Sequence, residues 1–318
     1  MKAEVLKILI DKIQGAKRIL ISGHKNPDGD SLCSVLALSR LLKINFDKNA
    51  VCVYDGNIPD MFDNVPLRDT MQYHEHMNLS KAFDLVFVLD YGTKNHIGGA
   101  MPAVEKAKFI IEIDHHKNDD TIGNLCLNND KSSSVGEIIF DIAKKSGWRA
   151  DEVVNDLLAI SILTDTGFFK YTREGTVLRI MAKLVDSGVD IDRLSNLLNN
   201  KPRKTVLTEA AVASRAEFFY HGSLAIAIID SKDYKNLDGR GDIVLSLLGQ
   251  IKGVEYIALL KQQKEKQVGV SLRSKTKSVN HIAMALGGGG HDCAAGAVVY
   301  DTLENVHAKI LELFRGAK

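Results

Sequence analysis

Three apolar segments of this chain end in acidic or histidine side chains, and this pattern constrains the fold most. Residues 18–23, 84–90 and 108–114 are short runs rich in Ile, Val, Leu and Phe, bounded by polar residues. Such runs are typical of strands in a parallel sheet that is covered on both faces. Because α/β proteins bind their ligands beyond the carboxyl ends of parallel strands, the residues that follow these runs are expected to lie close together.

The residues after these runs include many acids and histidines. They are His24, Asp28, Asp30, Asp90, Asp114, His115 and His116. A further acid, Asp165, follows an apolar helical stretch over residues 153–163. Desolvated carboxylates that lie together repel one another unless cations neutralise them. The cluster therefore predicts a site for two divalent metals, and such sites usually act on phosphate groups.

The order of these motifs resembles that of the DHH phosphoesterases. The four matching motifs are His24-x-x-Pro27-Asp28-x-Asp30, Asp90, Asp114-His115-His116 and Asp165. The C-terminal third resembles the substrate-binding domain called DHHA1, with Ser271-Leu-Arg273-Ser274 followed by Gly287-Gly-Gly-Gly-His291. Asp292-Cys293 after that histidine is a minor departure from the usual pattern. Within the family, the chain looks most like the compact oligoribonuclease and adenosine 3′,5′-bisphosphate (pAp) phosphatase type.

The resemblance implies an α/β fold in two domains. An N-terminal DHH domain, expected over residues 1–190, holds a parallel sheet flanked by helices and binds the metals. A smaller α+β DHHA1 domain, expected over residues 216–318, binds the substrate. The polar segment 191–215 is predicted to be a linker with helical pieces in it. A chain of 318 residues with 45% hydrophobic content agrees with two cores.

The resemblance also implies roles for the acids and histidines. One metal is ligated by His24 and Asp28, the other by Asp30, His115 and Asp165, with Asp90 as the bridge. Asp114 supports a ligand or the bridging water, and His116 contacts the scissile phosphate or protonates the leaving group. Mixed oxygen and imidazole ligands favour Mn²⁺, with Mg²⁺ and Co²⁺ as alternatives.

Substrate recognition is expected in the second domain. The predicted contacts are Arg273, Ser274, Gly288, Gly289, Gly290 and His291. An arginine can pair with a phosphate through two hydrogen bonds, and glycine lets the backbone approach a phosphate closely. Without Arg273 and His291, four consecutive glycines would indicate a flexible loop as readily as a phosphate site.

Several functions share this chemistry. The leading hypothesis is hydrolysis of short RNA to mononucleotides, with pAp as a further substrate. Cyclic dinucleotides, or their linear products, are the nearest alternative. A manganese-type inorganic pyrophosphatase would lack the signature at 287–291. A non-catalytic nucleotide sensor is disfavoured because every expected metal ligand is present. The presence of all four motifs matters here, since Asp28-Gly29-Asp30 alone would predict no more than a solvated turn.

Composition limits the partners. With 41 basic and 40 acidic residues there is no excess of charge to hold long duplex DNA, so short RNA or small phosphorylated nucleotides are expected.

The four cysteines form no C-x-x-C pair, which indicates free thiols in a reducing compartment. No signal peptide or membrane-spanning run is evident, so a cytoplasmic protein without membrane contact is predicted. A homodimer would be unsurprising.

Overall fold

The computed structural model describes residues 2–79, 81–117, 121–172, 174–237 and 241–315. They divide into two compact units, Met1–Asn200 and Lys201–Lys318, and each unit is described by itself. None of the helices in these ranges is long and apolar enough to cross a membrane.

The first unit is built on one parallel sheet. Its strands are β1 (Ile19–Ser22), β2 (Ala50–Tyr54), β3 (Gln72–Tyr73), β4 (Leu85–Leu89), β5 (Ile110–Ile113) and β6 (Leu125–Cys126). They pair in the order β3-β2-β1-β4-β5-β6, with every pair parallel. The three apolar runs of the sequence are β1, β4 and β5, as predicted. Chain order reverses between β1 and β4, and a crevice opens at such a point in α/β sheets.

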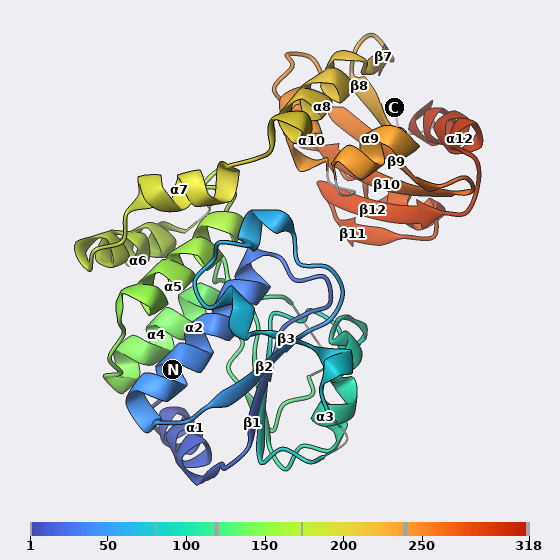
Figure 1. The fold of residues 1–318 in the computed structure, drawn as a ribbon. Helices are drawn as coiled ribbons and strands as arrows, with labels where there is room; N and C mark the ends of the chain where they lie inside the picture. Colours follow the sequence, from blue (N-terminus) through green and yellow to red (C-terminus); the bar gives the residue numbers. More distant parts are fainter. Residues whose placement is uncertain (1, 80, 118–120, 173, 238–240, 316–318) are drawn as a thin grey trace. The chain divides into compact units, whose positions relative to one another are not determined.

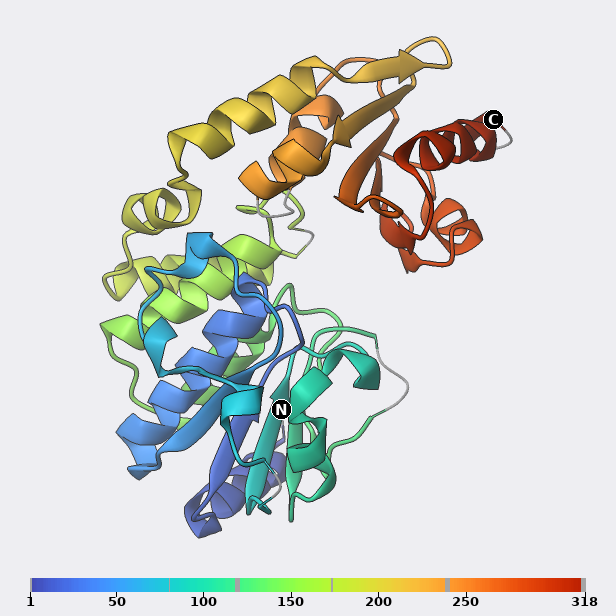
Figure 2. The same cartoon turned by 45° about the vertical axis from the view of Figure 1, so that its right-hand side comes forward.

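Helices cover both faces of this sheet. They are α1 (Ala3–Gly15), α2 (Gly29–Phe46), α3 (Met101–Glu105), α4 (Val135–Ser146), α5 (Glu152–Asp165), α6 (Gly175–Asp186) and α7 (Ile191–Asn199), with short 3₁₀ turns η1 (Asp60–Phe62), η2 (Arg68–Thr70), η3 (His74–His76), η4 (Lys94–His96) and η5 (Gly98–Ala100). Figure 1 and Figure 2 show α2, α4 and α5 on one side of the sheet and α3 on the other. Successive residues of β4 alternate between two cores: Phe87 packs with the α2–α5 side, and Val86 and Val88 pack with the α3 side.

The second unit has a mixed sheet with helices, as the α+β prediction requires. Its strands are β7 (Glu217–Phe219), β8 (Leu224–Ile229), β9 (Tyr256–Lys264), β10 (Gln267–Ser274), β11 (Gly289–His291) and β12 (Ala294–Val299). Its helices are α8 (Arg203–Ser214), α9 (Ser231–Asn236), α10 (Asp242–Gly249), α11 (Asn280–Ala285) and α12 (Leu303–Arg315). The order is β11-β12-β10-β9-β8-β7, and only the β8–β9 pair is parallel.

The segment 191–215, which we expected to be a linker, is largely α7 and α8. Helix α7 belongs to the first unit, where Leu194 and Leu198 are fully buried and Arg193 donates two 2.7 Å hydrogen bonds to Asp156 of α5. The division between the units falls between Asn200 and Lys201, inside the expected linker. Only one side of α7 is apolar, which explains why the sequence of this segment looked like a linker.

Candidate metal centre

The first group of ligand candidates lies where β1 leads into α2. Asp28 is the N-cap of α2, and its Oδ1 accepts a 3.0 Å hydrogen bond from the backbone N–H of Ser31. Asp30 follows in the first turn, buried beneath it. The tight entry requires Gly29, since a Cβ there would lie 2.4 Å from Thr164 Oγ1. The cap therefore fixes Asp28 and Asp30 in different directions from one helix end.

Asp90 directly follows β4 and has a left-handed backbone with a φ of 50°. This conformation is costly for a residue with a side chain and is held by its neighbours. The N–H of Asp90 donates to Ile113 O at 3.0 Å, while the N–H groups of Tyr91 and Gly92 donate to Asp114 Oδ2 at 3.2 and 2.8 Å. The loop after β4 is thus fixed by the strand and acid of the third motif.

The two oxygens of Asp90 point toward different histidines. Oδ2 lies 3.6 Å from His24 Nε2, and Oδ1 lies 3.4 Å from His115 Nε2 and 3.5 Å from His116 Nδ1. His24 Nε2 is also 3.6 Å from Asp28 Oδ1. Asp90 therefore lies between a group formed with the first loop and a group formed with the third motif.

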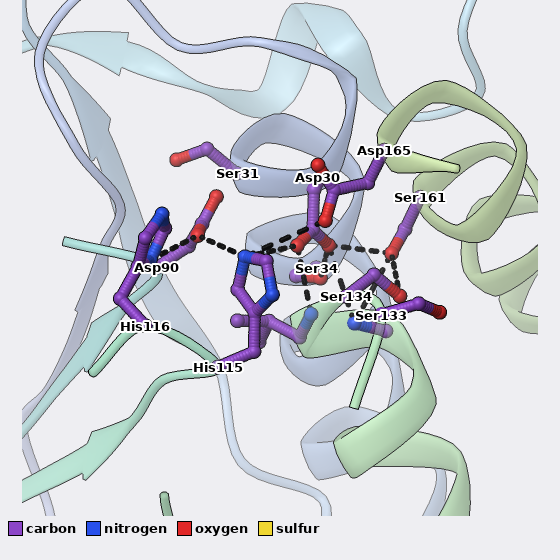
Figure 3. A network of polar contacts seen from close by, with 12 residues as sticks. Asp30, Ser31, Ser34, Asp90, His115, His116, Ser133, Ser134, Ser161 and Asp165 are labelled. Atoms are coloured by element: carbon purple, nitrogen blue, oxygen red, sulfur yellow. Dashed lines mark hydrogen bonds and ion pairs between the residues drawn. The ribbon is translucent and has the colours of Figure 1, made fainter. Parts of the chain in front are cut away.

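The second group continues on the far side of His115. Its Nε2 lies 3.4 Å from Asp165 Oδ2, at the C-terminal end of α5, and 3.9 Å from Asp30 Oδ2 (Figure 3). Three sets of ligand atoms each lie within 4.8 Å of one another: His24–Asp28–Asp90, Asp30–His115–Asp165 and Asp90–His115–His116. The six predicted metal ligands are thus brought together in the first two sets, and the third set adds His116 beside Asp90 and His115.

Two buried carboxylate oxygens in this cluster accept no hydrogen bond from the described residues. Asp90 Oδ1 and Asp165 Oδ2 are inaccessible to solvent and have no hydrogen-bond partner among the described residues. A buried acceptor without a donor is costly, and native proteins rarely leave one. Divalent cations could be coordinated by these two oxygens and would remove that cost. The residues present therefore fit the metals that the sequence predicts.

The acids and histidines shift one another's pKa. Burial and then Asp90 raise the pKa of Asp30 well above its usual range. Burial also raises the pKa of Asp165, to about 7, although the charge of His115 opposes this rise. Burial alone would lower the pKa of His24 and His115, but neighbouring carboxylates outweigh it and raise these values to about 9 and about 10. Protons therefore supply the neutralising charge that cations would otherwise provide.

Asp30 is held by a set of donors that the sequence did not reveal. Its Oδ1 accepts from the hydroxyls of Ser34 (2.9 Å) and Ser161 (2.5 Å) and from Gly136 N–H (3.2 Å), and its Oδ2 accepts from Val135 N–H (2.7 Å). The two amides are the first of α4, so a helix N-terminus faces this acid (Figure 3). Three donors on Oδ1 leave Oδ2 as the oxygen that faces His115.

Ser161 and Glu112 are the residues that our sequence reasoning missed. Ser161 is a fully buried hydroxyl in the middle of the apolar helix α5, and Glu112 is a fully buried acid within the apolar strand β5. A single polar residue inside an otherwise apolar run is the signal that could have identified both, since such a group must find partners when buried.

Asp114 and His116 form a pair of their own. Asp114 Oδ1 accepts from the backbone N–H of His116 at 3.0 Å and lies 2.8 Å from its Nδ1. The hydrogen bond to Asp114 raises the pKa of His116. Burial would raise the pKa of Asp114, but the hydrogen bonds from His116 outweigh it and lower that pKa. With Nδ1 directed at Asp114, the other ring nitrogen, Nε2, is left for a different partner.

The predicted substrate contacts lie at one end of the second sheet. Ala294 pairs with Arg273 of β10 on one side and with His291 of β11 on the other, so these two lie at the same level, two strands apart. The guanidinium of Arg273 is 4.0 Å from Asp242, an exposed acid. The hydroxyl of Ser274 donates to Glu255 Oε1 at 2.9 Å, so this proton is already engaged within the unit.

The three glycines predicted to contact the substrate, Gly288, Gly289 and Gly290, differ in what surrounds them. A Cβ on Gly288 would lie 2.1 Å from Gly296 O, and one on Gly290, whose φ is 147°, would lie 2.6 Å from Ala294 O. These two positions are closed by the neighbouring strand β12. A Cβ on Gly289 would meet no atom closer than 4.0 Å, so open space lies beside its backbone.

Family models match both units. The model described as DHH family, N-terminal domain, matches residues 18–162, and the DHHA1 domain model matches residues 222–317. The chain belongs to the DHH family. It combines the family's N-terminal domain with a C-terminal DHHA1 domain, as the motifs predicted.

Curated relatives match along nearly the whole chain. The chain is 29% identical over 304 residues to the probable bifunctional oligoribonuclease and PAP phosphatase NrnA of Streptococcus mutans, covering 94% of this chain and 95% of that protein. It is 30% identical over 318 residues to the bifunctional oligoribonuclease and PAP phosphatase NrnA of Thermus thermophilus, covering 98% and 92%.

Two further similarities are more limited. A manganese-dependent inorganic pyrophosphatase of Methanothrix thermoacetophila is 29% identical over 161 residues, which is 49% of each chain. The crystal structure of an exopolyphosphatase-related protein from Bacteroides fragilis superposes with a TM-score of 0.91 at 20% identity, covering 99% of this chain and 96% of that one. The latter agrees with the fold.

Proposed function

We propose that this protein is a metal-dependent phosphoesterase that hydrolyses short RNA oligonucleotides to mononucleotides and pAp to AMP. The observation on which the proposal rests is the position of Asp90, with one oxygen toward His24 and the other toward His115. A carboxylate in that position could contribute one oxygen to each cation of a two-metal site. Membership of the DHH family and relatives named as oligoribonucleases and PAP phosphatases support the same conclusion.

In this proposal, His24 and Asp28 would hold one Mn²⁺, Asp30, His115 and Asp165 would hold the other, and Asp90 would be shared. When bound, the pair of cations supplies a water of lowered pKa as nucleophile and neutralises charge on the phosphate. The pyrophosphatase relative of the first unit, named as manganese-dependent, supports this choice of metal.

Asp114 and His116 are not metal ligands in this proposal and have other roles near the phosphate. Asp114 fixes Nδ1 of His116 and the backbone of the Asp90 loop, so it is a positioning residue. His116 then presents Nε2 to the scissile phosphate or to the leaving oxygen. A side chain that donates a proton to the leaving group typically contributes about 10²–10⁴-fold to the rate.

The second unit recognises the substrate. Arg273 pairs with a phosphate of the substrate other than the one that is cleaved. His291 and the open backbone at Gly289 contact that same phosphate. Short RNA with a terminal phosphate and pAp both carry a phosphate that is not cleaved, and these contacts suit such a group. No long duplex is required, in keeping with the balanced charge of the chain.

The test is Mn²⁺-dependent product release from a matched panel: RNA of two to five nucleotides, pAp, a cyclic dinucleotide and pyrophosphate. We expect release of mononucleotides from the short RNA and of inorganic phosphate from pAp, with both lost after chelation. Preferential cleavage of the cyclic dinucleotide would overturn the RNA assignment but keep the metal chemistry. Tight nucleotide binding without turnover of any of these substrates would overturn the proposed enzyme and favour a nucleotide sensor.

A further inference from the structure

Glu112 is a buried acid that the proposed chemistry does not use. It lies in the middle of β5, is fully buried, and has no ion pair with a cation in the described part of the chain. Its neighbours Ile111 and Ile113 pack in the core on the α2–α5 side of the sheet, so Glu112 points to the other face. An apolar residue would satisfy a strand at this place at lower cost, because an isolated buried carboxylate is expensive.

The side chain of Glu112 is instead surrounded by donors. Its Oε2 accepts from the hydroxyl of Tyr91 at 3.0 Å and from the backbone N–H groups of Ile122 at 2.9 Å and Gly123 at 2.8 Å, and its Oε1 accepts from the side-chain amide of Asn128 at 2.5 Å. Four donors converge on one carboxylate, and all come from loops beside β5. This set of contacts joins segments that the sheet alone does not hold together.

One of these contacts leads to Asp90. Tyr91 follows Asp90 directly, and Asp90 has the left-handed backbone described above. The hydroxyl of Tyr91 is the donor in its 3.0 Å hydrogen bond to Glu112, because a carboxylate can only accept. The side chain of Tyr91 is therefore fixed to β5, one residue from the carboxylate that lies between the two ligand groups.

The other contact leads to Asp114. The side-chain amide of Asn128 donates to Glu112 while its Oδ1 accepts a 3.1 Å hydrogen bond from the backbone N–H of Asp114. Asp114 in turn accepts from the N–H groups of Tyr91 and Gly92. The network closes on itself, with Glu112 as the acceptor that both branches share.

We propose that Glu112 is a positioning residue of the metal centre, which fixes Asp90 through Tyr91 and Asp114 through Asn128. The inference rests on the proposed metal site and adds a residue outside the four family motifs. It assigns Glu112 the role of an outer partner, which orients ligands without touching the metals. Loss of a group that hydrogen-bonds a metal ligand directly typically lowers metal affinity about 10–100-fold, so the lower end of this range is expected for Glu112, which acts through Tyr91 and Asn128.

The first test is a calorimetric titration of Mn²⁺ into metal-free full-length protein, without any substrate. Glu112→Gln keeps the size of the side chain but replaces one accepting oxygen with an amide nitrogen that cannot accept. We expect Mn²⁺ affinity to fall about tenfold. Asp156→Asn is the matched control, since Asp156 is a buried acid of the same unit, paired with Arg193 outside the network. It should alter thermal stability but leave Mn²⁺ affinity unchanged.

A second variant covers the case in which Glu112→Gln does not fold. Tyr91→Phe removes one hydroxyl and should weaken Mn²⁺ binding by a smaller factor, about three- to tenfold, within the range of a single hydrogen bond. Amide hydrogen exchange of the metal-free protein gives a readout that needs no metal. The amides of residues 91 and 92 should exchange faster in Tyr91→Phe and Glu112→Gln than in Asp156→Asn.

The outcomes separate this role from the proposed function. Equal Mn²⁺ affinity and equal exchange at residues 91 and 92 in wild type and in the folded variants would overturn the positioning role. A wild-type protein that binds Mn²⁺ but cleaves none of the RNA or pAp substrates would overturn the proposed function and leave the positioning role intact.

Discussion

His116 Nδ1 lies 2.8 Å from Asp114 Oδ1, and this pair orients the second histidine of the motif relative to Asp90. The same carboxyl group of Asp114 accepts the backbone N–H groups of Tyr91 and Gly92 through its other oxygen. One buried acid therefore sets both the direction of the His116 ring and the course of the loop that holds Asp90. This arrangement gives Asp114 a role in the site although it is not one of the predicted metal ligands.

Replacing His116 should slow the reaction without removing the metals. His116→Asn is expected to lower kcat by about 10²–10⁴-fold, because it removes a group that acts at the leaving oxygen. Calorimetry should show Mn²⁺ binding close to that of wild type. His74→Asn is the control, since His74 pairs with Asp55 at 3.3 Å and belongs to none of the metal-ligand groups found among the described residues. Normal turnover in His116→Asn would contradict the role.

Asp114→Asn should move the pH dependence of the reaction. Asp114 raises the pKa of His116, so its removal lowers that pKa. If protonated His116 acts as the acid, the alkaline limb of the kcat profile should move to lower pH, with Mn²⁺ kept saturating at each point. A reduced rate with an unmoved alkaline limb would show that Asp114 acts on the loop of Asp90 alone.

Arg273→Ala should weaken substrate binding with little effect on kcat. A bond from a charged donor contributes about 1.5–3 kcal/mol, so KM for a 5′-phosphorylated dinucleotide should rise about 10–150-fold. The effect should disappear for the same dinucleotide without its terminal phosphate. Lys264→Ala, an exposed cation at the end of β9, is the control. A loss of kcat for both substrates would assign Arg273 to the reacting phosphate.

Without metal, the protein should lose stability as the pH rises. The pKa of Asp165 is raised from 3.8 to about 7, and those of His24 and His115 are raised from 6.5 to about 9 and about 10. All three groups bind their protons more tightly in the folded state. The stability that each contributes is therefore fully present below its pKa in the unfolded state, and it is lost as the pH rises through its pKa in the folded state. The histidine contributions therefore disappear between about pH 6.5 and 10.

Denaturant unfolding of chelator-treated protein at several pH values in that window measures this effect. We expect the free energy of unfolding to fall with rising pH, and the fall to vanish or reverse in saturating Mn²⁺, which takes the place of the protons. An unfolding free energy that increases with pH in the metal-free protein would contradict the account.

Gly136→Ala should disturb the support of Asp30. A Cβ at this position would lie 2.0 Å from Ser161 Oγ, so α4 and α5 would have to separate. Forcing a methyl group into a closed contact typically costs about 1–3 kcal/mol, and Asp30 should also bind its metal more weakly. Gly15→Ala is the control, because its Cβ would meet no atom within 4 Å. Equal unfolding free energies for the two variants would show that the contact is not tight.

The sequence alone predicted the ligand cluster because strand ends leave few choices. A run such as residues 84–90 favours a buried strand, and an acid at the end of such a strand is expected at the carboxyl edge of the sheet. Asp90 and Asp114 could therefore be placed near each other without a structure. Family resemblance added the pairing of ligands, which spacing alone left open.

The support of these ligands could not be predicted in the same way. The hydroxyl of Ser161 reaches Asp30 across 131 positions of sequence, and no local pattern encodes such a contact. Likewise, Glu112 could have been recognised as a buried acid, but its link to Asn128 depends on how two loops pack. Leu194 and Leu198 likewise lie in a polar segment of the sequence, and their burial depends on tertiary contacts that no local pattern encodes.

The most direct test of the account is mononucleotide release from an RNA dinucleotide by wild type and Asp90→Ala, each stripped of metal and then given Mn²⁺. Among the residues that the structure describes, Asp90 is the one carboxylate directed at both ligand groups. We therefore predict that Mn²⁺ restores cleavage in wild type and that the folded Asp90→Ala protein stays inactive. Cleavage by Asp90→Ala at the wild-type rate, or by stripped wild type without added metal, would contradict it.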